Sequence, residues 1–283
     1  MATVYLNGEY LAAEQAKVSV FDRGFLLGDG VYEVIPVYQG HCFELEGHLA
    51  RLQRSLDGVR INNPMTDAEW SEMIQTLIDR NGRGDQAVYL QVTRGVAPRD
   101  HLFPANATPS VFVMSNPMQP IPDAFKAQGI KCITLPDIRW QRCDIKAITL
   151  LANSLLKQQA HEQGAQEALL IKDGHLTEGA ASNAYIVKNG VIYTPEKNAE
   201  VLPGITRDVV LRLAEQAGIE LHQQMITEAE LHDADEIWIS SSTREMLPVT
   251  VLDDHPVGNG QPGPVWQRLI ALYQQLKQEQ NLG

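Results

Sequence analysis

The sequence predicts an α+β protein of two domains. Segments with strand and helix patterns mix without the regular strand–helix–strand order of a doubly wound parallel sheet. A length of 283 residues corresponds to two domains of roughly 150 residues each. Prolines cluster in the short segment 116–122, where they remove backbone donors and favour an extended connection. We therefore expect an N-terminal α+β domain over 1–117, a proline-rich linker over 118–122 and a C-terminal α+β domain over 123–283.

The first domain is expected to begin with a β-hairpin. Asn7-Gly8 lies between two short apolar runs, a pattern typical of a tight turn between antiparallel strands. Further strands are expected over 30–38 and 41–44. An amphipathic helix follows, because apolar residues recur at helical spacing at Leu49, Leu52, Leu56 and Val59.

A second helix of this domain has clear boundaries in the sequence. Thr66 and Glu69 form the signature of a capping box, and Met65 and Trp70 suit the hydrophobic staple that often accompanies it. The turn at Asn81-Gly82 ends the helix. The domain is completed by strands that we expect over 87–94 and 110–114.

The second domain also mixes both kinds of element. Strands are expected over 130–135, 167–171, 184–188, 191–193 and 236–240. Helices are expected over about 148–161, from Thr206 as N-cap to a stop before Gly218, after a capping box at Thr227, and over 264–277. The segment 177–183 is rich in small residues, and we expect it to form a loop before a strand.

Charge and cysteine content exclude several functional classes. With 23 Lys+Arg and 35 Asp+Glu the formal net charge is −12, which argues against nucleic acid and anionic membranes as main partners but leaves a small anionic ligand open. No apolar run is long enough for a transmembrane helix, and residues 1–14 do not resemble a signal peptide. The cysteines are odd in number and lack metal or redox spacing, so we expect reduced thiols in a cytoplasmic protein.

Two familiar binding motifs are discounted. Gly258–Gly263 matches G-x-G-x-x-G, but a proline lies inside it and too little chain follows for a dinucleotide-binding unit, so a surface hairpin is favoured. The histidines are scattered and do not form a metal-ligand pattern. We therefore expect neither a dinucleotide nor a metal.

Two single residues are candidates for catalysis. Lys146 follows apolar and aromatic neighbours, where a lysine can become a nucleophilic amine; the alternative is a surface lysine, which is commoner. Glu178, if buried, needs a cationic partner, and a protonated ring nitrogen could be that partner. The alternative for Glu178 is an exposed loop acid.

Three segments are candidates for binding an anion. Leu202–Asp208 runs from a glycine turn into a helix start, where free N–H groups and the helix dipole favour a phosphate. Ser240–Thr243 places hydroxyls directly after a strand. Arg99 and His101 lie in a proline-bounded loop, where a guanidinium fork and an imidazole can trap a carboxylate. For these segments an ordinary capped helix, a turn and a solvated basic loop remain alternatives.

Taken together, these segments resemble the fold-type IV pyridoxal-phosphate enzymes, the class IV aminotransferases. The resemblance covers nearly the whole chain and rests on an ordered set of motifs: Asp22–Glu33, His48–Leu52, Arg142–Lys146, Leu176–Gly179 with Ser182-Asn183, and Leu202–Asp208. Within the class, the loop with Arg99 and His101 resembles that of the D-amino acid aminotransferases most. Branched-chain L-aminotransferases share the Glu178 and Thr206 motifs but lack this loop. Aminodeoxychorismate lyases share the lysine and the glycine turn at Gly28, and also lack it.

The resemblance implies a role for each candidate. Lys146, in the C-terminal domain, would hold pyridoxal 5′-phosphate as a Schiff base and shuttle a proton, and Glu178 would pair with the protonated pyridine nitrogen. The other cofactor-binding residues would be Arg51, Leu202, Ile205, Thr206, Ser241 and Ser242. Tyr32, Arg99 and His101 would bind the substrate carboxylate, the last two reaching in from the other subunit of a homodimer. Ser242 stands where a threonine is usual, and Arg244 is a bulky cation near the same loop.

The implied reaction is a ping-pong transfer of an amino group between a D-amino acid of the D-alanine type and a 2-oxo acid, 2-oxoglutarate or pyruvate. A branched-chain L-amino acid aminotransferase and an aminodeoxychorismate lyase are the alternative enzymes. A non-catalytic phosphate-binding dimer is the alternative from another functional class.

Overall fold

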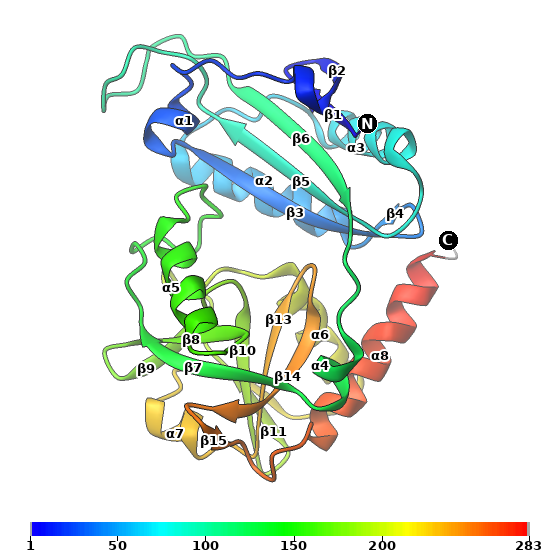
Figure 1. Ribbon diagram of the computed structural model, residues 1–283, viewed down its shortest axis with the longest axis vertical. Coiled ribbons are helices and arrows are strands. Elements are labelled where there is room, and N and C mark those ends of the chain that lie inside the picture. Colours follow the sequence, from blue (N-terminus) through cyan, green and yellow to red (C-terminus); the bar gives the residue numbers. More distant parts are fainter. Residues whose placement is uncertain (1, 282–283) are drawn as a thin grey trace. The chain divides into compact units, whose positions relative to one another are not determined.

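The computed structural model describes residues 2–281, which form two compact units (Figure 1). Among these residues, the first unit contains 2–119, the segment Ile145–Thr149, and Gln280 and Asn281. The second contains Pro120–Asp144 and Leu150–Glu279. The first change of unit falls inside the range 118–122 that the prolines indicate as a linker. Both units combine helices with a sheet, so the α+β class is confirmed.

The first unit is a six-stranded antiparallel sheet with two long helices (Figure 1). Its strand order is β2-β1-β6-β5-β3-β4, with β1 Thr3–Leu6, β2 Glu9–Ala12, β3 Gly30–Tyr38, β4 His41–Cys42, β5 Gln86–Thr93 and β6 Ser110–Pro117. The helices α2 (Leu45–Val59) and α3 (Asp67–Asn81) bury an apolar stripe each in one core with the sheet. A single turn, η1 (Ala13–Gln15), and a short helix, α1 (Arg23–Leu27), complete the unit.

Local sequence signals of the first unit are confirmed. Asn7 and Gly8 both take positive φ, as a tight hairpin turn requires, and the capping box of Thr66 and Glu69 starts α3. The strand expected over 41–44 is shorter, ending at Cys42. The physical reason is that Glu44 takes a left-handed conformation, φ 56°, as the N-cap of α2.

The segment around Lys146 differs from expectation. The Tyr32 amide donates to the Lys146 carbonyl at 2.9 Å, Val31 pairs with Ala147, and the Ile148 amide donates to the Gly30 carbonyl at 3.1 Å. These bonds fasten residues 145–149 to β3 through one isolated bridge, and the segment itself bends at Ile145 and Ile148. Lys146 therefore belongs to the first unit, whereas we expected it in the C-terminal domain, and the helix expected from 148 begins only at Leu151.

The second unit is a nine-stranded mixed sheet with five helices (Figure 1). The main path of the sheet is β12-β11-β10-β13-β14-β7-β8-β9, and β15 pairs with β14. The strands are β7 Ile130–Pro136, β8 Glu167–Lys172, β9 His175–Gly179, β10 Asn183–Lys188, β11 Val191–Thr194, β12 Leu221–Gln223, β13 Glu236–Ser241, β14 Glu245–Leu252 and β15 His255–Pro256. The helices are α4 Asp123–Ala127, α5 Leu151–Glu162, α6 Ile205–Gln216, α7 Glu228–His232 and α8 Pro264–Asn281.

Two expectations for the second unit are wrong in their detail. Thr177–Gly179 is not a loop, because β9 pairs antiparallel with β8 and takes Glu178 into the sheet. Thr206 is not the N-cap of α6: Gly204 holds that position, and Thr206 is already helical. The capping box at Thr227 is confirmed. Within residues 2–281, no helix combines the length and apolar character needed to cross a membrane.

Candidate functional site

The candidate residues form two groups, one in each unit. In the first unit, the structure brings Lys146 and Tyr32 together. The Lys146 amine nitrogen lies 4.3 Å from the centroid of the Tyr32 ring, within the range of a cation–π contact. The Lys146 amide donates to the Ser55 hydroxyl at 3.2 Å, and the Tyr32 ring stacks on Tyr89 at 5.7 Å between centroids. Backbone and ring contacts therefore fix the position of this lysine relative to β3.

Arg51 in the same unit is held by a buried acid on β3. Its Nε and Nη2 atoms each donate to the Glu33 carboxylate at 2.8 Å, and Nδ1 of His48 lies 2.8 Å from the same group. All three side chains are buried. Burial alone would raise the pKa of Glu33, but the Arg51 charge and hydrogen bonds from Arg51 and His48 hold it far below its ordinary value. Glu33 and His48 thus orient the guanidinium that we expect to bind phosphate.

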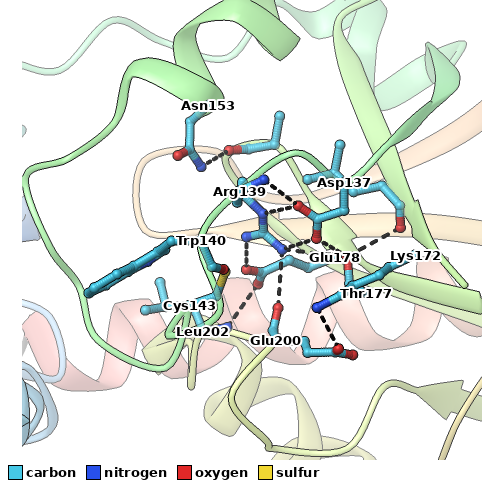
Figure 2. Close-up of polar contacts among 12 residues, drawn as sticks. Asp137, Arg139, Trp140, Cys143, Asn153, Lys172, Thr177, Glu178, Glu200 and Leu202 are labelled. Atoms are coloured by element: carbon cyan, nitrogen blue, oxygen red, sulfur yellow. Dashed lines mark hydrogen bonds and ion pairs between the residues drawn. The ribbon is translucent and has the colours of Figure 1, made fainter.

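Glu178, in the second unit, is the centre of a buried polar network (Figure 2). One carboxylate oxygen, Oε2, accepts from the Asn183 amide at 3.0 Å and from the Leu202 backbone N–H at 3.1 Å. The other, Oε1, accepts a short hydrogen bond from Nη1 of Arg139. Donors from three segments of the chain therefore bond the Glu178 carboxylate. One of them is the backbone N–H of Leu202, so the structure brings two of the predicted residues together.

Burial raises the pKa of Glu178 to about 7, against the lowering effects of the Arg139 charge and of its hydrogen bonds with Arg139 and the Leu202 N–H. Burial alone would lower the pKa of Arg139, but its hydrogen bond with Asp137 and the charges of Glu178 and Asp137 raise it well above its ordinary value. Arg139 is therefore a permanent cation beside a carboxyl that can change protonation near neutral pH. Such a carboxyl is suited to stabilise a positive charge placed against it.

Sequence reasoning missed Arg139 and Asp137. The Asp137 carboxylate grips the guanidinium at two points, Nε–Oδ1 3.0 Å and Nη2–Oδ2 2.7 Å, and Nη2 also donates to the Glu200 carbonyl at 3.1 Å (Figure 2). One signal in the sequence could have indicated Arg139, because a buried acid such as Glu178 needs a cationic partner. We assigned that role to a protonated ring nitrogen, although Arg139 lies in the same segment as Lys146.

The start of α6 provides free backbone donors. Ile205 and Thr206 are its first helical residues, and N–H groups in the first turn have no partner within the helix. A Cβ atom on Gly204 would lie 1.9 Å from the Asn183 amide oxygen, so this N-cap position requires glycine. The N–H groups and the helix dipole together suit a phosphate.

The remaining candidates lie in surface segments. Ser241 is the last residue of β13 and Ser242 begins the turn to β14. Nη1 of Arg244 donates to the Gln166 carbonyl at 3.3 Å, which directs this cation towards β8. In the first unit, Arg99 and His101 are exposed on the loop between β5 and β6.

The chain is similar to known proteins over nearly its whole length. The family model described as amino-transferase class IV matches residues 30–252. The chain is 44% identical to a D-alanine aminotransferase of Bacillus licheniformis over 271 residues, 96% of this chain and 95% of that protein. It is 39% identical to a D-alanine aminotransferase of Staphylococcus aureus (strain MW2) over 269 residues, 95% of each chain.

Solved structures of branched-chain aminotransferases have the same fold. The enzyme of Escherichia coli matches with a TM-score of 0.91 at 28% identity, covering 97% of this chain and 94% of that one. A branched-chain aminotransferase solved with pyridoxamine 5′-phosphate matches with a TM-score of 0.88 at 29% identity, covering 96% and 92%. With the family model spanning most of the sequence, the chain belongs to the class IV aminotransferases.

Proposed function

We propose that this protein transfers an amino group between a D-amino acid of the D-alanine type and a 2-oxo acid, 2-oxoglutarate or pyruvate, with pyridoxal 5′-phosphate as cofactor. The observation that carries the D-amino acid assignment is 44% identity over 96% of the chain to a D-alanine aminotransferase. The likeness in fold to a branched-chain aminotransferase, a TM-score of 0.91 at 28% identity, makes branched-chain L-amino acids the second candidate substrates.

The residues present fit the cofactor. The first turn of α6, with Ile205 and Thr206, offers N–H donors for a phosphate, and Gly204 keeps a side chain away from the Asn183 amide. Arg51, Ser241 and Ser242 supply a further cation and hydroxyls, and Leu202 an apolar surface for a ring. When bound, the cofactor supplies an electron sink for the negative charge that develops at the substrate Cα.

Lys146 and Glu178 carry the chemistry in this proposal. Lys146 would hold the cofactor through its amine, and the released amine would move a proton from the substrate Cα to C4′ of the cofactor. Tyr32, whose ring lies 4.3 Å from that amine, limits the positions the lysine can take. Glu178, beside the permanent cation Arg139, holds the proton of the cofactor's ring nitrogen. Because one site serves both substrates in turn, we expect ping-pong kinetics.

Arg99, His101 and Tyr32 are proposed to bind the substrate carboxylate. The Cα–H bond must point towards Lys146, so exchanging the carboxylate and the side chain between their two pockets exchanges the enantiomers. The pocket that holds the cation therefore decides which enantiomer reacts. A guanidinium fork contributes roughly 1.5–3 kcal/mol as a charged hydrogen bond, which is about tenfold or more in affinity.

We propose that the active protein is a homodimer in the cytoplasm. Exposed apolar side chains in the first unit support the dimer, since a second copy of the chain can cover them. They include Val18, Val20, Phe21, Phe25, Leu102 and Phe103, each more than half exposed. Leu102 and Phe103 directly follow His101 in the chain, and we propose that Arg99 and His101 act in the site of the neighbouring subunit. The free cysteines Cys42, Cys132 and Cys143 fit a reducing compartment.

The deciding experiment compares D-alanine, L-alanine and L-leucine as amino donors to 2-oxoglutarate. We expect turnover with D-alanine and at least tenfold less with either L-amino acid. Preferred turnover of L-leucine would establish the branched-chain alternative instead. Lys146→Ala should abolish steady turnover, and near-normal turnover of that variant would remove Lys146 from the proposal.

A further inference from the structure

The loop with Arg99 and His101 is fastened to the rest of the first unit by two buried arginines that share one acid. Nε of Arg23 donates to Oδ2 of Asp29 at 2.8 Å. Nε and Nη2 of Arg94 donate to Oδ2 and Oδ1 of Asp29 at 2.8 and 3.0 Å. The side chains of Arg23 and Arg94 are 3% and 7% exposed, so these ion pairs are shielded from water.

Arg23 reaches the middle of the loop. Its Nη1 donates to the Asp100 carbonyl at 2.7 Å and to the Leu102 carbonyl at 3.3 Å. These carbonyls lie on either side of His101 in the chain, and Asp100 itself separates Arg99 from His101. One guanidinium therefore fixes the backbone between the two residues that we propose bind the carboxylate.

Arg94 reinforces the same arrangement from the other side of Asp29. Its guanidinium carbon lies 3.6 Å from the centroid of the Phe103 ring, and its nitrogens donate to the carbonyls of Val59 and Arg60 at 2.7 and 2.9 Å. The second pair of contacts satisfies carbonyls at the end of α2. Arg94 thus ties the loop to a helix of the core.

Asp29 keeps its charge in this position. Burial alone would raise the pKa of Asp29, but hydrogen bonds from Arg94 and Arg23, and their charges, hold it below its ordinary value. The start of the loop is also fixed, since the Arg23 amide donates to the Gly95 carbonyl at 2.9 Å and the Ala97 amide to the Phe21 carbonyl at 3.2 Å.

We propose that Arg23, held by Asp29, is a positioning residue that sets the affinity and stereoselectivity of the carboxylate site by fixing the loop with Arg99 and His101. The inference rests on the proposed function, in which these two residues bind the substrate. A loop that is already ordered loses less conformational entropy when the carboxylate binds. Loss of the brace should therefore weaken substrate binding more than it slows the reaction of bound substrate.

The test uses Arg23→Gln and Arg23→Lys in the holoenzyme. For Arg23→Gln we expect the KM for D-alanine to rise about tenfold and the D/L preference to fall, with kcat changed less than about twofold. Lysine keeps a cation beside Asp29 but lacks a second nitrogen that can reach the loop carbonyls at the same time, so Arg23→Lys should give an intermediate KM. The backbone amides of residues 99–103 should exchange hydrogen faster in both variants, with or without substrate.

Arg83→Gln is the matched control, because Arg83 pairs with Asp79 on the exposed face of the same unit. It should keep the wild-type KM and amide exchange. If Arg23→Gln fails to fold, Arg23→Lys decides. A folded Arg23 variant with wild-type KM and exchange, alongside an Arg99→Ala variant with a raised KM, would overturn the brace and leave the proposed function intact. A wild-type KM and D/L ratio in Arg99→Ala would instead overturn the carboxylate role on which the inference rests.

Discussion

Replacing Arg139 by glutamine should leave two buried acids without the cation that they share. The side chains of Arg139, Asp137 and Glu178 are 6%, 4% and 5% exposed, and the guanidinium bonds both carboxylates. Breaking a buried ion pair by removing one partner costs about 3–5 kcal/mol. At about 2–4 °C per kcal/mol for a chain of this size class, the melting temperature should fall by about 6–20 °C.

The loss should depend on pH in a defined direction. Without Arg139, its charge and hydrogen bond no longer oppose the burial that already raises the pKa of Glu178 to about 7. An acid whose pKa is higher in the folded than in the unfolded chain favours folding at low pH, and this advantage is lost as pH rises through its folded value. The stability deficit of Arg139→Gln should therefore be smaller at pH 5 than at pH 8.

The assay is urea denaturation at both pH values, with Arg142→Gln as control. Arg142 bonds Asp144 at 2.9 Å through two nitrogens, but its side chain is 51% exposed, so its replacement should leave the denaturation midpoint almost unchanged. A deficit for Arg139→Gln no larger than that of the control, or one unchanged between the two pH values, would refute the reasoning. In Arg139→Gln with the cofactor bound, Glu178 should keep its own proton, and the turnover rate should fall.

Three further measurements test other parts of the structure. Burial lowers the pKa of His48 despite its hydrogen bond with Glu33, so the free energy of unfolding should fall as pH drops below about 6.5. In urea denaturation, His48→Gln should reduce this dependence on pH by up to about 1.4 kcal/mol per pH unit. Burial raises the thiol pKa of Cys42 to about 12 and that of Cys143 to about 11. A thiol reagent at pH 8 should therefore label these two cysteines only after denaturation, and fast labelling of the native protein would contradict this expectation. Thr66→Ala should cost about 1 kcal/mol of unfolding free energy, and an unchanged denaturation midpoint would show that the cap of α3 contributes nothing.

The sequence was informative wherever structure depends on neighbours in the chain. The hairpin at Asn7-Gly8 and the capping boxes at Thr66 and Thr227 are set by a few adjacent residues, and each forms as predicted. The irregular segment 145–149 could not be foreseen, because its backbone is held by hydrogen bonds to β3, more than a hundred residues earlier. Its apolar residues alone are equally compatible with a helix.

The same limit applies to the candidate site. The motifs indicated Lys146, Glu178 and the start of α6, since those residue types suit the chemistry on their own. The partners of Glu178 were not identified from the motifs, because Arg139 and Asn183 lie outside β9 and meet its side chain only in the folded unit. A side chain's ion-pair partner is a property of the folded sheet, and local spacing does not specify it.

Asn183 has a consequence for which ligands the second unit can accept. Its single amide nitrogen donates to Glu178 Oε2 at 3.0 Å and to the Leu202 carbonyl at 2.9 Å. This one short side chain thus fixes the distance between the Glu178 carboxylate and the turn that leads into α6. A molecule that engages the acid at one end and the helix start at the other must match this fixed length.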